Sequence, residues 1–280
     1  MAASFSTLLL ATTPLILYQM VYIHNNIIVA TYMLIGVAAL WTALNEKSSA
    51  YLQLGIFAFL GLSLSRTEVT LFAAVFFVAA ISFGRFSNRD WLKGLAPYSV
   101  ILTCWNLWLL LVVKPDTHIL TPTRTALIIA VITGLSVMVT LLRFRLIRLR
   151  IAPNLHYIML TVFSLMLLYI VLVDFQHLVR MAGVFLSNLF SVGWLWWGVT
   201  WWIIAAWLWA VRRKPDISGE KLFVVGITGF FMLITAISYV HPFRIGWSDS
   251  ANRAFTHILP VIVFYLTLKT APLLFGRAPS

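Results

Sequence analysis

The stretch WSDSANRAFTHILPVIVFYLTLKTAPLLF, from Trp247 to Phe275, joins a polar string to a long apolar run. Its apolar part has the length of ~20 residues at which an α-helix crosses the hydrocarbon core of a bilayer. Four polar side chains precede that part: Asp249, Ser250, Asn252 and Arg253. Only 10% of the chain is charged, and ionisable groups beside a membrane are costly enough to be candidates for function. The alternative is an interfacial loop in which Ser250 or Asn252 caps the helix and the arginine reaches the headgroups.

The whole chain has the composition of a membrane protein. It is 61% hydrophobic with a mean hydropathy of +0.96, whereas soluble domains are ~45–50% apolar. Ten runs are candidate crossings: 5–22, 27–44, 50–64, 67–83, 95–113, 122–141, 155–173, 190–211, 222–240 and 255–275. Lipid cannot satisfy backbone polar groups, and no ten-residue block alternates as barrel strands do. We therefore predict an all-α polytopic transmembrane bundle of about ten crossings, forming a single integral membrane domain over 1–280.

The runs 50–64 and 67–83 are short and are separated only by Ser65 and Arg66. One helix over both would be about 50 Å long, which is too long for a single crossing. The pattern predicts a tight hairpin with Arg66 and Glu68 at its tip. The alternative is a continuous tilted helix that carries a buried Arg–Glu pair, at the cost of a charge inside the membrane.

Basic residues are distributed unevenly between the loops of the two sides. One side holds thirteen of the twenty Lys and Arg: Lys47, Arg85, Arg89, Lys93, Arg143, Arg145, Arg148, Arg150, Arg212, Arg213, Lys214, Lys221 and Arg277. The positive-inside rule makes this side cytoplasmic and places both termini there. The net charge of +12 does not indicate nucleic-acid binding, because no such motif is present and anionic membrane lipids are the natural partners of short juxtamembrane basic loops.

Polar residues of the opposite side point to a site that opens outward. Four of the six histidines lie there, on separate loops without metal-binding spacing, and the single Cys104 makes no metal site, so no metal-ligand set is predicted. Residues 174–189 have the apolar spacing of a helix lying in the outer interface. The following run, 190–211, holds seven of the twelve tryptophans. They either pack and face lipid or form an aromatic wall for a lipid chain or pigment.

Three patches of the chain resemble a known enzyme family. They are ATTPLILYQMVYIHNN (Ala11–Asn26), GLSLSRTEVTLFAAVFF (Gly61–Phe77) and HPFRIGWSDSANRAFTHILPVIVFYL (His241–Leu266). The second is similar to the hairpin of GT-C superfamily membrane glycosyltransferases, in which a short helix ends in an Arg-x-Glu step. The third resembles the C-terminal segment of the mannosyltransferase-like branch of bacteria and archaea. The resemblance follows the order of these patches along most of the chain.

The resemblance implies an enzyme of a prokaryotic inner or plasma membrane that takes sugar from a polyprenyl-phosphate donor on the outer face, usually aided by a divalent metal. An inverting transfer needs a carboxylate base and a cation for the leaving phosphate. Asp249 and Glu68 are the candidate acids. The expected lipid-phosphate-binding residues are Arg253, Arg244, Asn252, Ser250, His257 and Arg66.

The chain departs from the family pattern at its start. Such enzymes usually carry the catalytic aspartate in a long first outer loop, which this sequence lacks, and His24-Asn25-Asn26 stands where a later acid is common. We therefore expect the C-terminal half of a split or degenerate glycosyltransferase, with a partner membrane protein supplying the missing helices. The alternative is a non-catalytic subunit that stabilises a larger membrane complex. A transporter is disfavoured, since no matching pair of Gly/Pro-broken helices is evident.

Overall fold

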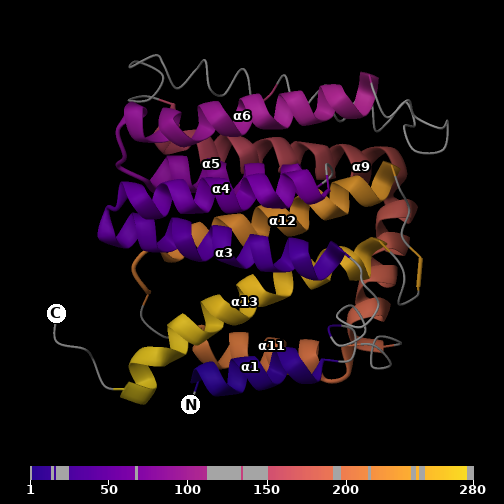
Figure 1. Ribbon diagram of the computed structural model, residues 1–280. Helices are drawn as coiled ribbons and strands as arrows, with labels where there is room; N and C mark the ends of the chain where they lie inside the picture. The colour runs from indigo at the N-terminus through magenta and orange to yellow at the C-terminus, as the bar shows by residue number, and fades with distance from the viewer. Residues whose placement is uncertain are drawn as a thin grey trace. The chain divides into compact units, whose positions relative to one another are not determined.

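The computed structural model describes residues 2–13, 16, 25–66, 69–111, 134, 151–191, 197–213, 216–240, 244–245 and 250–275. Over these residues the protein is helical and contains no strand, as predicted (Figure 1). The helices are α1 (Ala2–Thr12), α3 (Asn25–Glu46), α4 (Ser49–Ser65), α5 (Thr70–Phe83), α6 (Asn88–Leu111), η2 (Ala152–Asn154), α9 (Leu155–Leu186), η3 (Ser187–Ser191), α11 (Thr200–Val211), α12 (Glu220–Val240) and α13 (Ser250–Phe275).

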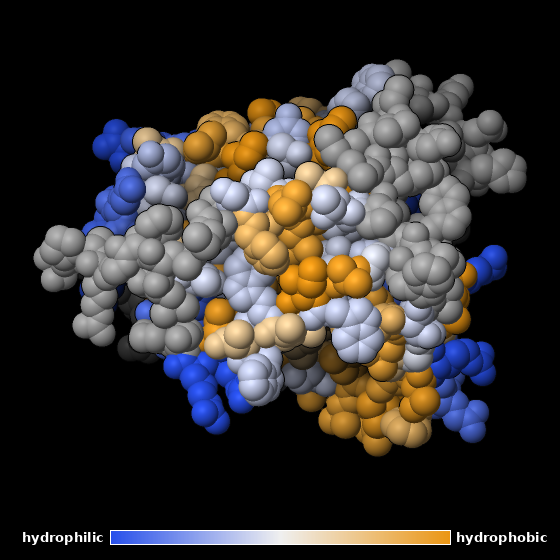
Figure 2. Space-filling model, turned by 90° about the horizontal axis from the view of Figure 1, so that it is seen from below, coloured by the Kyte–Doolittle hydropathy of each residue, from blue (hydrophilic) through white to orange (hydrophobic). Residues whose placement is uncertain are grey.

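Four helical stretches of the described chain are long and apolar enough to cross a membrane. They cover 26–46, 152–191, 220–239 and 252–271. Three further apolar helices, over 49–65, 70–83 and 200–211, are shorter than a full crossing. The predicted crossing over 122–141 lies outside the described residues, apart from Gly134. Figure 2 shows hydrophobic side chains exposed over much of this face, as expected for an integral membrane protein.

The helices group into two compact units. One comprises Met1–Leu34 with Met159–Ser280, and the other Ile35–Ile158. We refer to them as the terminal unit and the central unit. The prediction of one functional membrane domain over 1–280 stays a prediction.

In the central unit, α4 and α6 run in the same direction and pack closely. Gly94 of α6 allows this approach, because a Cβ there would come within 2.5 Å of side-chain atoms of Gln53 and Ile56. Ser87 and Asp90 cap α6 reciprocally: the backbone N–H of each donates to the other's side chain, at 3.1 Å in both cases. Asp90 also accepts a hydrogen bond from the Ser49 hydroxyl at 3.2 Å, which joins the starts of the two helices.

The predicted hairpin is present between α4 and α5. The helix stops at Ser65, and Arg66 has extended backbone angles (φ −156°, ψ 123°). The two helices then pack against one another, with the Phe59 ring 5.1 Å from that of Phe77 in a T-shaped contact. The alternative of one continuous helix is therefore wrong. Glu68, at the predicted tip, lies outside the described residues.

Helix α9 changes direction at Asp174, where the backbone is not helical (φ −150°, ψ 72°), and Figure 1 shows the bend. The Asp174 carboxylate accepts a hydrogen bond from the His177 backbone N–H at 2.9 Å, so it caps the second part of the helix. This break coincides with the predicted boundary between the crossing 155–173 and the segment 174–189. That the second part lies in the outer interface stays a prediction.

The predicted crossing over 190–211 is not one continuous helix. A π-helical turn, η3, ends at Ser191, and α11 begins only at Thr200. Gly198 separates them with a left-handed backbone (φ 56°), a conformation that glycine adopts without the steric cost other residues meet. The segment thus contributes a 12-residue helix preceded by a bend.

Four helices of the terminal unit, α1, α11, α12 and α13, run in two opposite directions. Helices α11 and α13 run in the same direction, because Trp197 and Trp207 contact the beginning and end of α13 respectively. Helix α1 runs the opposite way, because Thr13 at its end contacts Thr200 at the start of α11, while Ser6 contacts Thr267 near the end of α13. Helix α12 also runs the opposite way, because Glu220 at its start contacts Lys269 near the end of α13. The start of α1 therefore lies at the same end of the unit as the end of α13. These helix directions agree with the predicted alternation of crossings. Which side of the membrane each helix end faces stays a prediction.

Candidate functional site

Buried polar side chains from three segments meet at the first half of α13. We call this group the α13 polar cluster: Asn26, Trp197, Asn252, Thr256 and His257. Asn252 is fully buried, and its Oδ1 accepts a hydrogen bond of 2.9 Å from the indole Nε1–H of Trp197. Thr256, one turn further on, donates its hydroxyl proton to the backbone oxygen of Asn252 at 3.0 Å. Buried polar groups are costly without such partners, so these contacts hold the start of α13 in one orientation.

His257 links this helix to α3. Its Nε2 lies 3.2 Å from Oδ1 of Asn26, and both side chains are buried. The contact is a hydrogen bond in the tautomer that carries the imidazole proton on Nε2. Residues 231 positions apart are thereby joined, and the cluster draws on α3, the segment before α11, and α13.

Two of the predicted arginines, Arg253 and Arg244, lie on different segments of the terminal unit. Arg253 follows Asn252 directly and precedes His257 by one turn, and its side chain is partly exposed. The backbone oxygen of Arg244 accepts a hydrogen bond of 3.1 Å from Nδ2 of the buried Asn188 in η3, while the Arg244 side chain is exposed. A guanidinium at a helix start can bind an anion together with the backbone N–H groups of the first turn.

The structure thus brings some of the predicted site residues together and leaves others apart or undescribed. Asn252 and His257 join the buried cluster, and Arg253 lies on the same helix. Arg66 belongs to the central unit. Ser250 is the first residue of α13, and Asp249 and Glu68 lie outside the described residues. Sequence reasoning did not connect Asn26 to His257 or Trp197 to Asn252, because these partners are distant in the chain.

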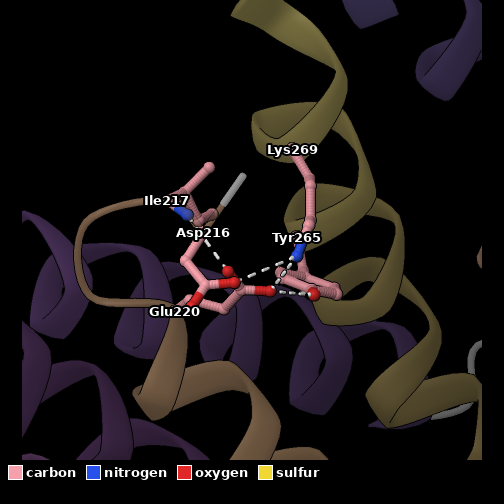
Figure 3. Close-up of polar contacts among 5 residues, drawn as sticks. All are labelled: Asp216, Ile217, Glu220, Tyr265 and Lys269. Atoms are coloured by element: carbon pink, nitrogen blue, oxygen red, sulfur yellow. Dashed lines mark hydrogen bonds and ion pairs between the residues drawn. The ribbon is translucent and has the colours of Figure 1, made fainter. Parts of the chain in front are cut away.

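The other end of α13 carries a charged cluster (Figure 3). Lys269 forms an ion pair with Oε1 of Glu220 and lies 3.8 Å from Oδ1 of Asp216. The Tyr265 hydroxyl also donates to Glu220, and the Ile217 N–H donates to its other oxygen at 3.0 Å. Lys269 is 7% exposed and Glu220 11%, so the pair is largely shielded from solvent.

This pair ties the start of α12 to the end of α13. Lys269 falls within the predicted crossing over 255–275, and no partner was predicted for it. A lysine inside an apolar run requires a counter-charge, so the sequence could have indicated Glu220, just before the predicted crossing over 222–240, as its partner. From Asn252 to Lys269 the helix rises about 26 Å, close to the ~30 Å thickness of a hydrocarbon core. The residues between the two clusters are mostly buried and apolar: Ile258, Leu259, Val261, Ile262, Val263 and Leu266.

Packing explains two of the clustered tryptophans. The rings of Trp197 and Trp201 lie 5.6 Å apart, and Trp201 contacts Phe255 of α13 at 5.8 Å, each in a T-shaped arrangement. Both indoles are buried. By contrast, Trp202 and Trp209 are exposed, as expected for lipid-facing or interfacial rings.

The described residues offer no obvious metal site. Among them, no three His, Cys, Asp or Glu side chains come together. The divalent metal implied by the family resemblance stays a prediction.

The chain was compared with known protein families, curated proteins and solved structures. No family, curated protein or solved structure matches it.

Proposed function

We propose that this protein is an integral membrane module of the GT-C glycosyltransferase type, with about ten crossings and cytoplasmic termini. In this proposal it binds a polyprenyl-phosphate-linked sugar at the start of α13, on the outer face of a prokaryotic inner or plasma membrane. It acts as the C-terminal half of a split or degenerate enzyme, with a partner membrane protein supplying further helices. The resemblance of the three sequence patches supplies the substrate class.

The observation that carries the proposal is the α13 polar cluster beside Arg253. Asn252 and His257 are buried and tied to other helices, which fixes the backbone from which Arg253 extends. A helix start directs its N–H groups and a partial positive charge outward. Together with the partly exposed Arg253 residue, this arrangement suits the phosphate of a lipid whose chain lies along the apolar helices.

The expected chemistry follows from these groups. Arg253 and Arg244 would stabilise the negative charge that develops on the departing lipid phosphate. Asp249 and Glu68 remain the candidate bases for an acceptor hydroxyl. A divalent metal would add further stabilisation of the phosphate, on the family resemblance alone.

The proposal is tested by binding of a polyprenyl phosphate to purified protein in nanodiscs. Arg253→Ala should weaken binding about 10- to 100-fold, the range expected for one charge-assisted hydrogen-bonding group. Arg253→Lys should restore only part of the affinity, because it keeps the charge and loses the planar fork. Arg180→Ala removes an exposed arginine of α9 and is the matched control. If Arg253→Ala bound the lipid as tightly as Arg180→Ala and the unmodified protein do, the assigned role of Arg253 would be contradicted.

A second candidate is a non-catalytic subunit of a larger membrane complex. The stretch 152–191 favours it, since only 6% of its most apolar part is buried within the protein. Such a helix offers an apolar surface that a partner membrane protein can cover. Purification in mild detergent followed by mass spectrometry separates the two functions. A stoichiometric partner without bound polyprenyl phosphate supports the subunit, and the bound lipid supports the transferase module.

A further inference from the structure

The turn between α11 and α12, at the opposite end of α13 from the proposed substrate site, has a distinct basic surface. Arg212 and Arg213 follow the last residue of α11, and Lys221 lies in the first turn of α12; all three side chains are exposed. Trp209, in the last turn of α11, is 68% exposed. We refer to these four residues as the Trp209 surface.

Arg212 is held in place by Trp209. Its guanidinium carbon lies 4.0 Å from the centre of the indole ring, and one terminal N–H donates to the Trp209 backbone oxygen at 3.0 Å. A cation over an aromatic face is electrostatically attracted to it, so the guanidinium is preorganised. Arginine has five N–H donors in a planar fork, and this single hydrogen bond leaves others to bind an anion.

The acids of the same turn are directed elsewhere. Glu220 is bound by Lys269, the Tyr265 hydroxyl and the Ile217 N–H, and Asp216 contacts Lys269 (Figure 3). Within the described part of this turn, neither acid forms an ion pair with the cations of the Trp209 surface. Lys269 offsets one of these two negative charges, and the three exposed cations Arg212, Arg213 and Lys221 outnumber the one that remains, so the turn carries a net positive charge.

The position of the surface indicates a lipid partner. Trp207 is fixed to α13 by a hydrogen bond of 2.8 Å from its Nε1–H to Thr270, which orients the end of α11. Trp209, two residues on, presents an exposed indole of the kind enriched at the headgroup level of bilayers. The positive-inside rule places this turn on the cytoplasmic side, where anionic phospholipids attract basic residues.

From this arrangement we propose that Trp209, Arg212, Arg213 and Lys221 form a binding surface for the headgroups of anionic phospholipids. The Arg212 guanidinium, stacked on the indole, binds the lipid phosphate, while Arg213 and Lys221 bind further negative charge of the headgroup. The surface is independent of the α13 polar cluster. A failure of one proposal therefore leaves the other standing.

The test is native mass spectrometry of the purified protein titrated with phosphatidylglycerol or phosphatidylcholine. The variant R212Q/R213Q/K221Q removes three charges from the surface, and R85Q/R89Q/K93Q removes three exposed charges from another predicted cytoplasmic loop. A cation close to an anionic headgroup is worth about fivefold in affinity, so loss of the three cations proposed to bind one headgroup together should lower the affinity for phosphatidylglycerol at least tenfold. The second variant and the binding of phosphatidylcholine should change less than threefold.

The R212K variant tests the stacked geometry without loss of charge. It should bind phosphatidylglycerol several-fold more weakly, because an ammonium lacks the planar fork. Glycerol 3-phosphate at the same concentration should not displace the lipid. Equal losses in the two triple variants would show that only net charge matters, and displacement by glycerol 3-phosphate would show a free-phosphate site. Either result overturns the proposal.

Discussion

Replacing Lys269 with methionine removes an ammonium group while keeping a flexible side chain of similar length. Glu220 then keeps its hydrogen bonds from Tyr265 and Ile217 but loses its counter-charge. Breaking a buried ion pair by removing one partner typically costs about 3–5 kcal/mol. The pair lies near helix ends, and the second acid, Asp216, is 93% exposed and adds little. We therefore expect the free energy of unfolding to fall by about 2–4 kcal/mol.

The double variant K269M/E220Q distinguishes this explanation from a simple packing defect. With both charges removed, nothing is left buried and uncompensated, and exchanging an entire buried pair for neutral groups is often nearly neutral. Its stability should return to within about 1 kcal/mol of the unmodified protein, which gives a coupling energy of at least ~1 kcal/mol between the positions.

The assay is reversible unfolding in mixed micelles, with the denaturing detergent varied and the free energy extrapolated. Lys221→Met is the matched control, because Lys221 neighbours Glu220 in sequence but is exposed; it should change stability by less than ~0.5 kcal/mol. A K269M variant as stable as this control would refute the reasoning. So would additive effects of K269M and E220Q, since the pair would then not join α12 to α13.

Three further predictions concern single contacts. Asp90 accepts hydrogen bonds from the Ser87 hydroxyl and N–H, and these lower its pKa despite partial burial. The charged carboxylate therefore stabilises the fold above the ordinary pKa of aspartate, and this stabilisation is lost as the pH falls through the lowered pKa. Ser87→Ala should remove much of this acid sensitivity, measured as the thermal unfolding temperature against pH. Gly94→Val should destabilise the central unit by about 1–3 kcal/mol in the micelle assay, whereas an unchanged protein would mean that α4 and α6 separate easily. Trp197→Phe leaves Asn252 without its indole donor and should cost about 1–3 kcal/mol in the same assay, with the N252A/W197F pair non-additive.

Local features of the sequence were sufficient to predict much of the secondary structure. The break at Arg66 followed from the length of two apolar runs, and the break at Asp174 fell where the apolar spacing changed. Helix propagation and the apolar length of a crossing depend on neighbouring residues, so both are readable along the chain. The interruption at Gly198 was missed, because one glycine in a tryptophan-rich run is only a weak signal for a left-handed residue.

Composition and local pattern were therefore enough to predict the class: an all-helical, apolar chain with polar residues at the ends of its predicted crossings. Which polar residues meet depends on how distant helices pack. His257 contacts Asn26, Asn252 accepts from Trp197, and Lys269 pairs with Glu220. Each partner is specified by which helices are neighbours and by their rotation about their own axes. These depend on side-chain packing between distant segments, and apolar periodicity carries little of that information when a helix is apolar on most of its faces.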